Sequence, residues 1–165
     1  MEQSLKAAAD EMWQEARKPN GTNCPCCTKH VQIYCRKFNS RMAATMIYVY
    51  RACTEYPGRW LEIGNFCAKK YDFIPGDHGK LLWWGLIERK PNDDTAKKSS
   101  GKYRITEKGR AFVERRLKVP SHVVEYMSVV EKFEGKLMGI DELLGKHFHY
   151  QELMHSSPLD FEVPL

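Results

Sequence analysis

Thiol and imidazole groups are concentrated in one short segment near the start of the chain. Cys24 and Cys27 are separated by two residues, the spacing at which a tight turn can direct two thiolates to one metal ion. His30 and Cys35 extend this pair to a C-x2-C-x2-H-x4-C series. Zinc prefers tetrahedral sites built from sulfur and nitrogen ligands. The segment therefore predicts one zinc ion bound by Cys24, Cys27, His30 and Cys35.

Other interpretations of these cysteines remain open. The series resembles the CCHC zinc knuckle of nucleic-acid-binding proteins, but the gap before the histidine is two residues shorter. The fourth ligand could instead come from Cys26, His147, His149 or His155. The cysteines could also be small turn residues, or Cys24 and Cys27 could be a redox pair. The redox interpretation is weaker, because low-pKa cysteines usually begin a helix and the residues that follow favour a strand.

The longest structural pattern in the chain runs from Leu81 to Leu117. It predicts a helix ended by a glycine, a strand, a polar loop over residues 92–101, a second strand and a final helix. Upstream, residues 39–56 predict a capped helix with apolar residues at helical spacing, followed by a short strand and a second short helix. This order of elements is typical of a winged helix-turn-helix domain over residues 39–118.

The predicted fold class is α+β, with a winged helix-turn-helix core between two smaller parts. Proline, glycine and asparagine residues mark the boundaries. The four predicted segments are an N-terminal amphipathic helix over residues 1–23, a zinc-knuckle-like unit over 24–38, the winged-helix domain over 39–118, and a C-terminal extension over 119–165 with a hairpin, a short helix and a flexible tail.

Positive charge is concentrated in the middle of the chain. The whole chain has a formal net charge of +5. Residues 29–118 contain 20 lysines and arginines against 9 aspartates and glutamates, whereas the rest of the chain contains 6 against 12. A basic centre between acidic ends is typical of a nucleic-acid-binding core with separate terminal functions. The less specific interpretation is a solvated basic surface.

In a winged helix-turn-helix domain, the third helix enters the major groove and the wing contacts the backbone or the minor groove. The predicted third helix, residues 78–86, places Leu81 and Trp84 on one face, which we assign to the core. We expect the opposite face and the nearby cations to contact double-stranded DNA, with the wing lysines on phosphate. The predicted contact residues are His78, Lys80, Trp83, Lys90, Lys97, Lys98, Lys102, Arg41, Lys69 and Lys70.

Several motifs together resemble a family of bacteriophage-encoded proteins with a C-P-x-C turn followed by the second half of a winged helix-turn-helix domain. The matching stretches are Cys24–Cys27, Tyr34–Lys37, Gly85–Ile87, Tyr103–Thr106, Lys108–Gly109 and Tyr150–Met154. Thr28 stands where that family usually has glycine. The resemblance implies a phage origin and the cytoplasm of a bacterial host, and it implies little about activity.

Two functions from different classes follow from these patterns. The first is a non-enzymatic DNA-binding protein that regulates transcription or genome processing. The alternative is a protein-interaction module that binds and inhibits a host complex, such as a defence system or RNA polymerase. Trp83 favours the alternative if it is exposed, because large aromatic side chains are common anchors at protein interfaces. It is equally open that Trp83 and Trp84 are both buried.

The composition argues against several other classes. The 165 residues are 42% hydrophobic, which is enough to form a core. The chain has no apolar run of the roughly 20 residues that span a bilayer, and its start lacks the apolar centre of a secretory signal, so we expect no membrane association. A phosphate-binding loop, a nucleophile elbow and an H-E-x-x-H motif are all missing from the sequence, so an enzyme is not expected. A homodimer formed through the terminal helices is a further possibility.

Overall fold

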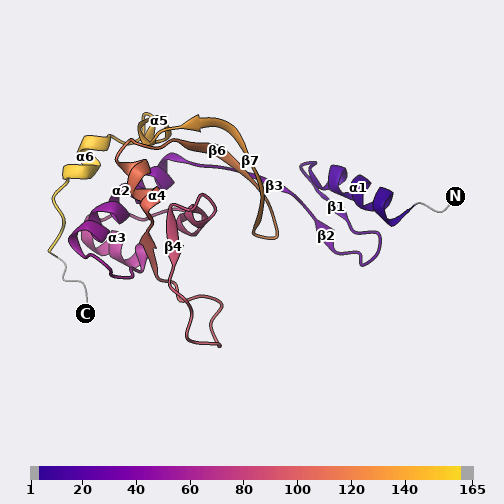
Figure 1. Cartoon of the computed structure of the whole chain (residues 1–165), viewed down its shortest axis with the longest axis horizontal. Coiled ribbons are helices and arrows are strands. Elements are labelled where there is room, and N and C mark those ends of the chain that lie inside the picture. The colour runs from indigo at the N-terminus through magenta and orange to yellow at the C-terminus, as the bar shows by residue number, and fades with distance from the viewer. Residues whose placement is uncertain (1–3, 161–165) are drawn as a thin grey trace. The chain divides into compact units, whose positions relative to one another are not determined.

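Helices and small antiparallel sheets alternate along the chain, which confirms the predicted α+β class (Figure 1). The computed structural model describes residues 4–160, and within them it has six α-helices, one 3-10 helix and seven strands. The chain divides into two compact units. Unit 1 comprises the residues up to Lys37 together with Ser121–Gly135, and unit 2 comprises Phe38–Pro120 together with the residues from Lys136 onward.

Unit 1 begins with α1, Leu5–Ala16. The Ser4 hydroxyl accepts a hydrogen bond from the backbone N–H of Ala7 at 3.2 Å, which satisfies one of the free donors at the helix start. β1 (Thr22–Asn23) and β2 (His30–Val31) then form an antiparallel hairpin. The predicted N-terminal helix is therefore present, and its first three residues lie outside the described part of the chain.

The small core of unit 1 lies between α1, the hairpin and a strand from much later in the chain. Its buried members are Ala16, Val31, Ile33 and Val124. Met12, Trp13, Cys24 and Tyr126 pack against them and are partly buried. The rings of Trp13 and Tyr126 meet edge to face with their centroids 5.0 Å apart, an arrangement that aromatic pairs favour.

A three-stranded sheet joins the two stretches of unit 1. Its strands are β3 (Tyr34–Lys37), β6 (Val119–Tyr126) and β7 (Val129–Met138), in the order β3-β6-β7. The predicted C-terminal hairpin is confirmed as β6 and β7. Because β3 pairs with β6, the structure places most of this hairpin with the N-terminal residues rather than in a separate extension.

The centre of unit 2 is α2, Ser40–Glu55. Asn39 caps this helix, because its side-chain oxygen accepts a hydrogen bond from the Met42 N–H at 2.9 Å. Residues 42–49 are all buried, as expected for a helix that is surrounded by other elements. Its neighbours include α3 (Ile63–Tyr71), α4 (Glu107–Val113), α5 (Ile140–Leu144) and α6 (Tyr150–His155).

A two-stranded antiparallel sheet in unit 2 carries a long loop. Its strands are β4 (Ile87–Arg89) and β5 (Tyr103–Ile105). Leu61 adds an isolated bridge and exchanges two backbone hydrogen bonds of 2.8 Å with Tyr103. The strand predicted around Leu61 is therefore reduced to a single bridge. Thr106 then caps α4, since its hydroxyl accepts a hydrogen bond from the Gly109 N–H at 3.0 Å.

The segment predicted as the third α-helix has a different conformation in the structure. In place of an α-helix over residues 78–86, the structure has a 3-10 helix, η1, over His78–Leu82. Three glycines in and around this segment lower its helical propensity. Leu81, within η1, and Trp84, just after it, both lie in the core, where they are 0% and 1% exposed. Their assignment to the core is confirmed.

The end of the described chain consists of short elements. α5 is present as predicted. The Glu142 carboxylate accepts a hydrogen bond from the N–H of Gly139, the N-cap residue, at 2.8 Å. Residues 156–160 have no regular secondary structure, as expected for the tail, and residues 161–165 lie outside the described part. Between residues 4 and 160, no helix combines the length and the apolar character needed to cross a bilayer.

Candidate nucleic-acid interface and cysteine turn

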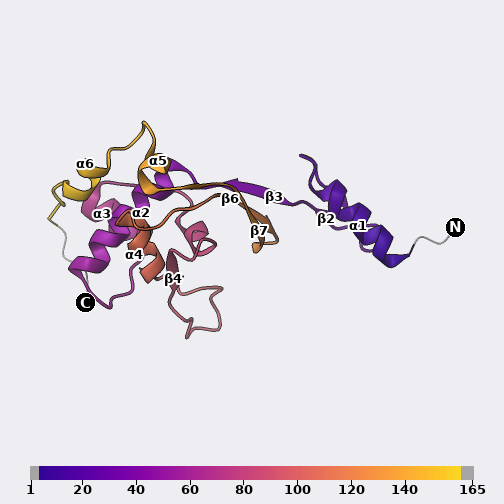
Figure 2. The same ribbon diagram turned by 45° about the horizontal axis from the view of Figure 1, so that its top comes forward.

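The loop between β4 and β5 is exposed along most of its length. We call residues 90–102 the wing loop. Figures 1 and 2 show it extending away from the helices of unit 2. Residues 91–98 are all exposed. At the base of the loop, the Lys90 N–H donates to the carbonyl of Lys102 at 2.8 Å, so the loop begins as a continuation of the sheet.

Side-chain hydrogen bonds shape the tip of the wing loop. The Asn92 side-chain oxygen accepts a hydrogen bond from the Asp94 N–H at 3.2 Å, and the Asp94 carboxylate accepts one from the Ala96 N–H at 3.0 Å. These are the local turns that asparagine and aspartate favour. One of the two acidic residues of the wing loop therefore has a structural role. The Asp94 carboxylate also lies 3.8 Å from the Lys97 ammonium. This exposed ion pair contributes little to stability.

The predicted contacts on η1 are less available than those on the wing loop. The Lys80 ammonium lies 2.9 Å from the Asp77 carboxylate, which partly neutralises it. His78 is half-buried and meets the Tyr103 ring edge to face, with centroids 5.7 Å apart. Burial lowers the pKa of the His78 imidazole, although the Asp77 carboxylate acts in the opposite direction. This shift favours the neutral imidazole and makes His78 a weaker cationic contact for phosphate.

We expect His78 to make unit 2 less stable in mild acid. Because its pKa is lower in the folded state, the unfolded state binds more protons at this position, and the free energy of unfolding rises with pH. The stability that the neutral His78 gives to the folded state should be fully present above the ordinary pKa of 6.5. It should be lost as the pH falls below that value. His78→Phe preserves a ring beside Tyr103 and should make the free energy of unfolding less dependent on pH. Urea unfolding between about pH 7.5 and about pH 5 measures the difference, and an equal dependence in both proteins would contradict this role.

The remaining predicted cations lie before η1. Arg41 is exposed and donates a hydrogen bond to the carbonyl of Ile74 at 2.8 Å. Lys69 is exposed in the last turn of α3. Lys70 is not available as a phosphate contact. Its side chain is 4% exposed, and its ammonium binds the Glu55 carboxylate at 2.7 Å and donates to the Tyr56 hydroxyl at 3.0 Å.

The spacing of residues in α3 explains the burial of Lys70. Ile63, Phe66, Cys67 and Lys70 are the buried residues of this helix, and positions separated by three, four and seven lie on one helical face. Burial opposes the charge of Lys70, but the hydrogen bonds with Glu55 and Tyr56 outweigh it and raise the pKa of the ammonium. Lys70 therefore stays charged as part of a structural ion pair.

The two adjacent tryptophans have different environments. Trp84 is 1% exposed, and its indole Nε1–H donates to the carbonyl of Pro120 at 2.7 Å. Its ring packs edge to face on Phe38, with centroids 4.9 Å apart. Trp83 is half-buried. Of the two tryptophans, Trp83 therefore keeps part of its surface available to a partner.

Three thiols cluster in the turn between β1 and β2. We call Cys24–Lys29 the cysteine turn. The Cys24 N–H donates to the carbonyl of Lys29 at 2.8 Å, and the Thr28 N–H donates to the carbonyl of Cys24 at 2.9 Å. Hydrogen bonds from the backbone of Cys27 and then of Cys26, followed by one from the Cys27 side chain, lower the pKa of the Cys24 thiol.

The predicted zinc ligands do not assemble into a single site. Within the described residues, no group of three or more histidine, cysteine, aspartate or glutamate side chains is arranged to hold a metal ion. His30 Nδ1 lies 3.3 Å from the Asn23 side-chain oxygen. The Cys35 thiol instead faces the Glu134 carboxylate at 3.9 Å. Cys24 and Cys27 are therefore the part of the predicted set that the turn brings together.

The other two cysteines, Cys53 and Cys67, belong to the core of unit 2. Cys53 and Cys67 are 4% and 0% exposed. Burial raises the pKa of the Cys53 thiol and raises that of Cys67 to about 12. Buried thiols of this kind are unreactive.

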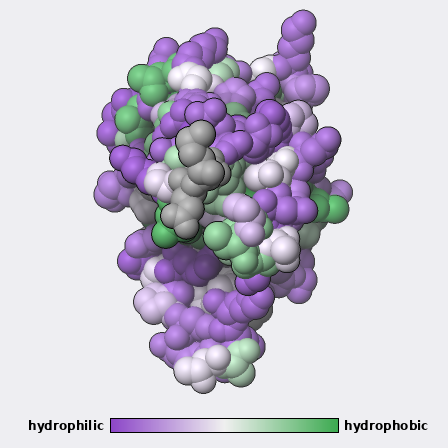
Figure 3. Space-filling model, turned by 90° about the vertical axis from the view of Figure 1, so that its right-hand side faces the viewer, coloured by the Kyte–Doolittle hydropathy of each residue, from purple (hydrophilic) through white to green (hydrophobic). Residues whose placement is uncertain are grey.

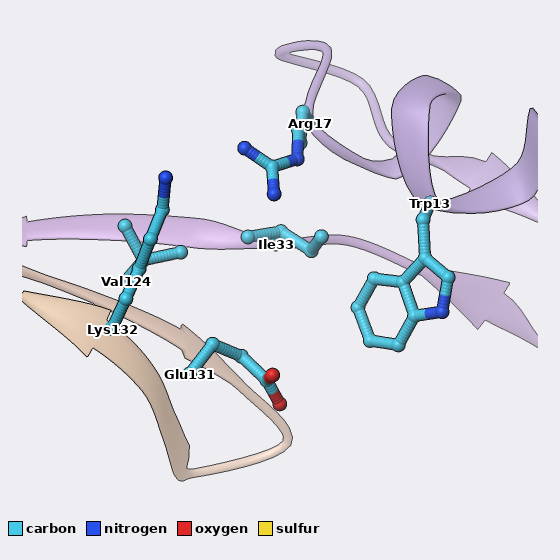
Figure 4. Close-up of a pocket in the computed structure, with 6 residues that line it drawn as sticks. All are labelled: Trp13, Arg17, Ile33, Val124, Glu131 and Lys132. Carbon is cyan, nitrogen blue, oxygen red and sulfur yellow. The ribbon is translucent and has the colours of Figure 1, made fainter. Parts of the chain in front are cut away.

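A shallow cleft in unit 1 involves residues that the sequence did not single out. It has a volume of about 230 Å³ and is lined by Trp13, Arg17, Ile33, Val124, Glu131 and Lys132 (Figure 4). The Lys132 ammonium lies 2.6 Å from the Glu134 carboxylate, so part of the positive charge is neutralised. The volume is below the roughly 300–1,000 Å³ of most small-molecule sites, and we assign no ligand to the cleft.

The surface drawn in Figure 3 is mostly hydrophilic. On that face, outside the grey atoms, hydrophobic residues appear in small separated areas. Large continuous apolar patches are the usual mark of a protein interface.

Comparison with protein-family models, with curated proteins and with solved structures finds no match to this chain.

Proposed function

We propose that unit 2 contains a winged helix-turn-helix domain that binds duplex DNA of a phage or its bacterial host without catalysing a reaction. The order α2, Leu61 bridge, α3, η1, β4, wing loop, β5 and α4 supports this assignment. In such domains the third helix and the wing contact the same duplex. The role would be in transcription or genome processing.

The observation that carries the proposal is the exposure of lysines on the wing loop. Lys97, Lys98 and Lys102 are all exposed, and the loop that bears them extends from the body of unit 2 (Figure 1). An ammonium group at the end of a flexible side chain contacts phosphate oxygens without geometric demands. The wing loop therefore has the chemistry of backbone binding, which adds affinity and little sequence preference.

The short η1 limits how much sequence the domain can read. A five-residue 3-10 helix is about 10 Å long at 2.0 Å per residue, which is shorter than most helices that read the major groove. Its lysine is paired with Asp77 and its histidine is half-buried. We propose that phosphate contacts dominate binding, with Trp83 and Lys80 at the edge of the groove.

The test is duplex binding measured by fluorescence anisotropy over a range of salt concentrations. The wing variant is Lys97→Ala, Lys98→Ala and Lys102→Ala combined. The matched control replaces three exposed lysines outside the wing loop, Lys6, Lys136 and Lys146. The logarithm of the binding constant should fall with the logarithm of salt concentration, with a slope that is shallower by about 0.9 for each phosphate that the variant no longer neutralises.

We expect a reduced slope in the wing variant and an unchanged slope in the control. Equal slopes in the two variants would mean that general positive charge, rather than the wing loop, attracts the duplex. Lack of binding by the wild-type chain at low salt would contradict the proposal outright.

The second candidate function is a module that binds a host protein complex. The observation in its favour is local: Ile74 is 73% exposed in the segment before η1, close to the half-buried Trp83 in sequence. Two apolar side chains make a small contact by the standards of stable interfaces. DNA binding is therefore the better-supported proposal, and the host protein becomes the preferred explanation if the wild-type chain does not bind duplex.

A further inference from the structure

A second cleft in unit 1 lies between the segment that contains β2 and β3 and the turn that joins β6 to β7. Its volume is about 320 Å³, which is within the range of most small-molecule sites. Most of the side chains around it can form hydrogen bonds, and they include His30, Gln32, Tyr34, Arg36, Glu125 and Ser128. A lining of this kind suits a ligand that has hydrogen-bonding groups of its own.

Strand pairing brings the charged groups of this cleft together. Tyr34 in β3 lies opposite Glu125 in β6, and Arg36, two residues after Tyr34, lies on the same face of the sheet. The Glu125 side chain is only 7% exposed, and its carboxylate accepts a hydrogen bond from Arg36 Nε at 3.3 Å. The second carboxylate oxygen accepts one from the Ser128 N–H at 3.0 Å. Both oxygens are thus engaged, and Glu125 orients the arginine rather than facing a ligand.

The Arg36 guanidinium group is held on two sides. Its central carbon lies 4.2 Å from the centre of the Tyr34 ring, which is a cation–π contact, and its Nε–H is directed at Glu125. Within residues 4–160, the side-chain hydrogen bonding of Arg36 involves Nε alone. The two terminal amino groups therefore remain as a fork of donors, which fits the oxygens of a phosphate or a carboxylate group.

The aromatic ring beside this fork is available for stacking. Tyr34 is 37% exposed, although Arg36 lies over part of its ring. Aromatic side chains stack on nucleobases of every kind, and an adjacent arginine adds to the contact. An acidic peptide would use the fork and leave the ring uncovered, whereas a nucleotide engages the fork through its phosphate and the ring through its base. The combination therefore favours a nucleotide.

The chain around the cleft is basic. Residues 16–37 contain five lysines and arginines and no aspartate or glutamate. Lys29, at the end of the cysteine turn, is exposed and directly precedes His30, which lines the cleft. These cations offset the charge that Glu125 neutralises on Arg36, and they favour an anionic ligand.

We propose that this cleft binds a nucleotide whose base is unpaired. The terminal amino groups of Arg36 hold oxygens of its phosphate, and its base stacks on the exposed part of the Tyr34 ring. A base inside a duplex is already stacked on its neighbours, so the ligand is a free nucleotide or one nucleotide of a single strand. The cleft belongs to unit 1 and the wing loop to unit 2, so the inference does not rest on duplex binding.

The test measures binding of a fluorescein-labelled oligothymidine strand by anisotropy. The protein is the full chain with the three wing-variant substitutions, so that the wing lysines do not contribute. The unlabelled competitors are thymidine monophosphate, the same strand, a strand of equal length without bases, a duplex and an oligoglutamate peptide. We expect the strand without bases, the duplex and the peptide to compete about tenfold more weakly than the intact strand, because they offer no base for stacking.

The monophosphate distinguishes the two sources of the nucleotide. Competition by thymidine monophosphate would identify a free nucleotide as the ligand. Competition by the intact strand without competition by the monophosphate would identify single-stranded nucleic acid. Either result supports the assignment of the cleft.

Three single variants in the same background locate the contact. Tyr34→Leu keeps an apolar side chain but removes the stacking surface, and Arg36→Lys keeps the charge but removes the fork. Each should weaken strand binding about tenfold. Lys37→Ala is the matched control, because it removes an exposed charge from β3 on the face opposite Arg36, and it should leave binding unchanged. Circular dichroism shows whether each variant is folded, and Tyr34→Leu decides the matter if loss of the contact with Glu125 unfolds Arg36→Lys.

The proposal fails on any of three results. Equal competition by the intact strand, the strand without bases and the duplex would mean that charge alone attracts the ligand. Strand binding that survives Tyr34→Leu, or that weakens as much in Lys37→Ala, would place the contact elsewhere. Lack of strand binding at low salt would exclude the site.

Discussion

Replacing Gly109 with alanine is expected to destabilise unit 2 by roughly 3 kcal/mol, near the upper end of typical overpacking effects. Gly109 lies in the first turn of α4, which faces the chain just before β4. A Cβ at this position would lie 2.1 Å from the carbonyl oxygen of Leu86 and 2.8 Å from Cγ1 of Ile105. The first of these is a backbone atom, so the clash cannot be relieved by turning a side chain, and α4 must move away from the sheet.

Gly64→Ala is the matched control for this substitution. Gly64 lies within α3, and a Cβ there would make an ordinary contact of 3.8 Å with the His78 ring. Alanine is favoured over glycine inside a helix by roughly 0.5–1 kcal/mol, so this variant should be neutral or more stable. Urea unfolding followed by circular dichroism measures both changes. Equal stability of the two variants would show that α4 does not pack on Leu86 as described.

Trp84→Ala is expected to destabilise unit 2 by about 3–5 kcal/mol, the range for loss of a large buried aromatic side chain. Trp84 is among the largest fully buried side chains of the described residues. Its ring contacts Phe38, which in turn packs on Phe112 with centroids 5.7 Å apart. Removal of the indole would therefore leave a cavity between α4 and the chain that leads into α2.

Two further substitutions separate the contributions of the indole. Trp84→Phe retains most of the packing but removes the Nε1–H that donates to the Pro120 carbonyl, and loss of this part-buried hydrogen bond should cost about 0.5–1.5 kcal/mol. Trp83→Ala, at a half-buried position, should cost about 1 kcal/mol or less. Urea unfolding that ranks Trp83→Ala as the more damaging alanine variant would contradict the assignment of Trp84 to the core.

Local features of the fold could be predicted from the sequence. A cap at Asn39 or Ser40 and the apolar spacing that follows predicted α2. The β-branched and aromatic content after Pro120 favoured a strand or hairpin, which the structure has as β6 and β7 with the turn at Met127 and Ser128. Both residues of that turn have positive φ, 48° and 65°, as required by the tightest hairpins. Each of these signals lies within a few neighbouring residues.

Features that depend on distant parts of the chain could not be predicted in this way. The pairing of Tyr34 with Glu125 joins segments that local patterns cannot connect. The 3-10 helix at His78–Leu82, where glycines weaken an α-helix, buries Leu81 in the core together with the more distant Trp84. Several helical and extended conformations satisfy the same local pattern, and the packing decides between them.

In the candidate sites, too, some features follow from local sequence and others depend on distant parts of the chain. The two-residue spacing of Cys24 and Cys27 correctly indicated a shared turn, but the positions of His30 and Cys35 relative to that turn depended on strand pairing. Lys70 could have been identified as buried, because it follows Ile63 by seven residues on the apolar face of α3. A lysine on such a face signals an internal ion pair rather than a surface charge.

The most direct test of the proposed DNA-binding surface is site-specific photocrosslinking to duplex DNA. A benzophenone side chain replaces Thr95, exposed in the wing loop, or Gln151, exposed on α6 of the same unit. The proposal predicts crosslinked DNA from position 95, abolished at high salt, and little or none from position 151. Crosslinking from position 151 alone, or to an equal extent from both positions, would contradict binding through the wing loop.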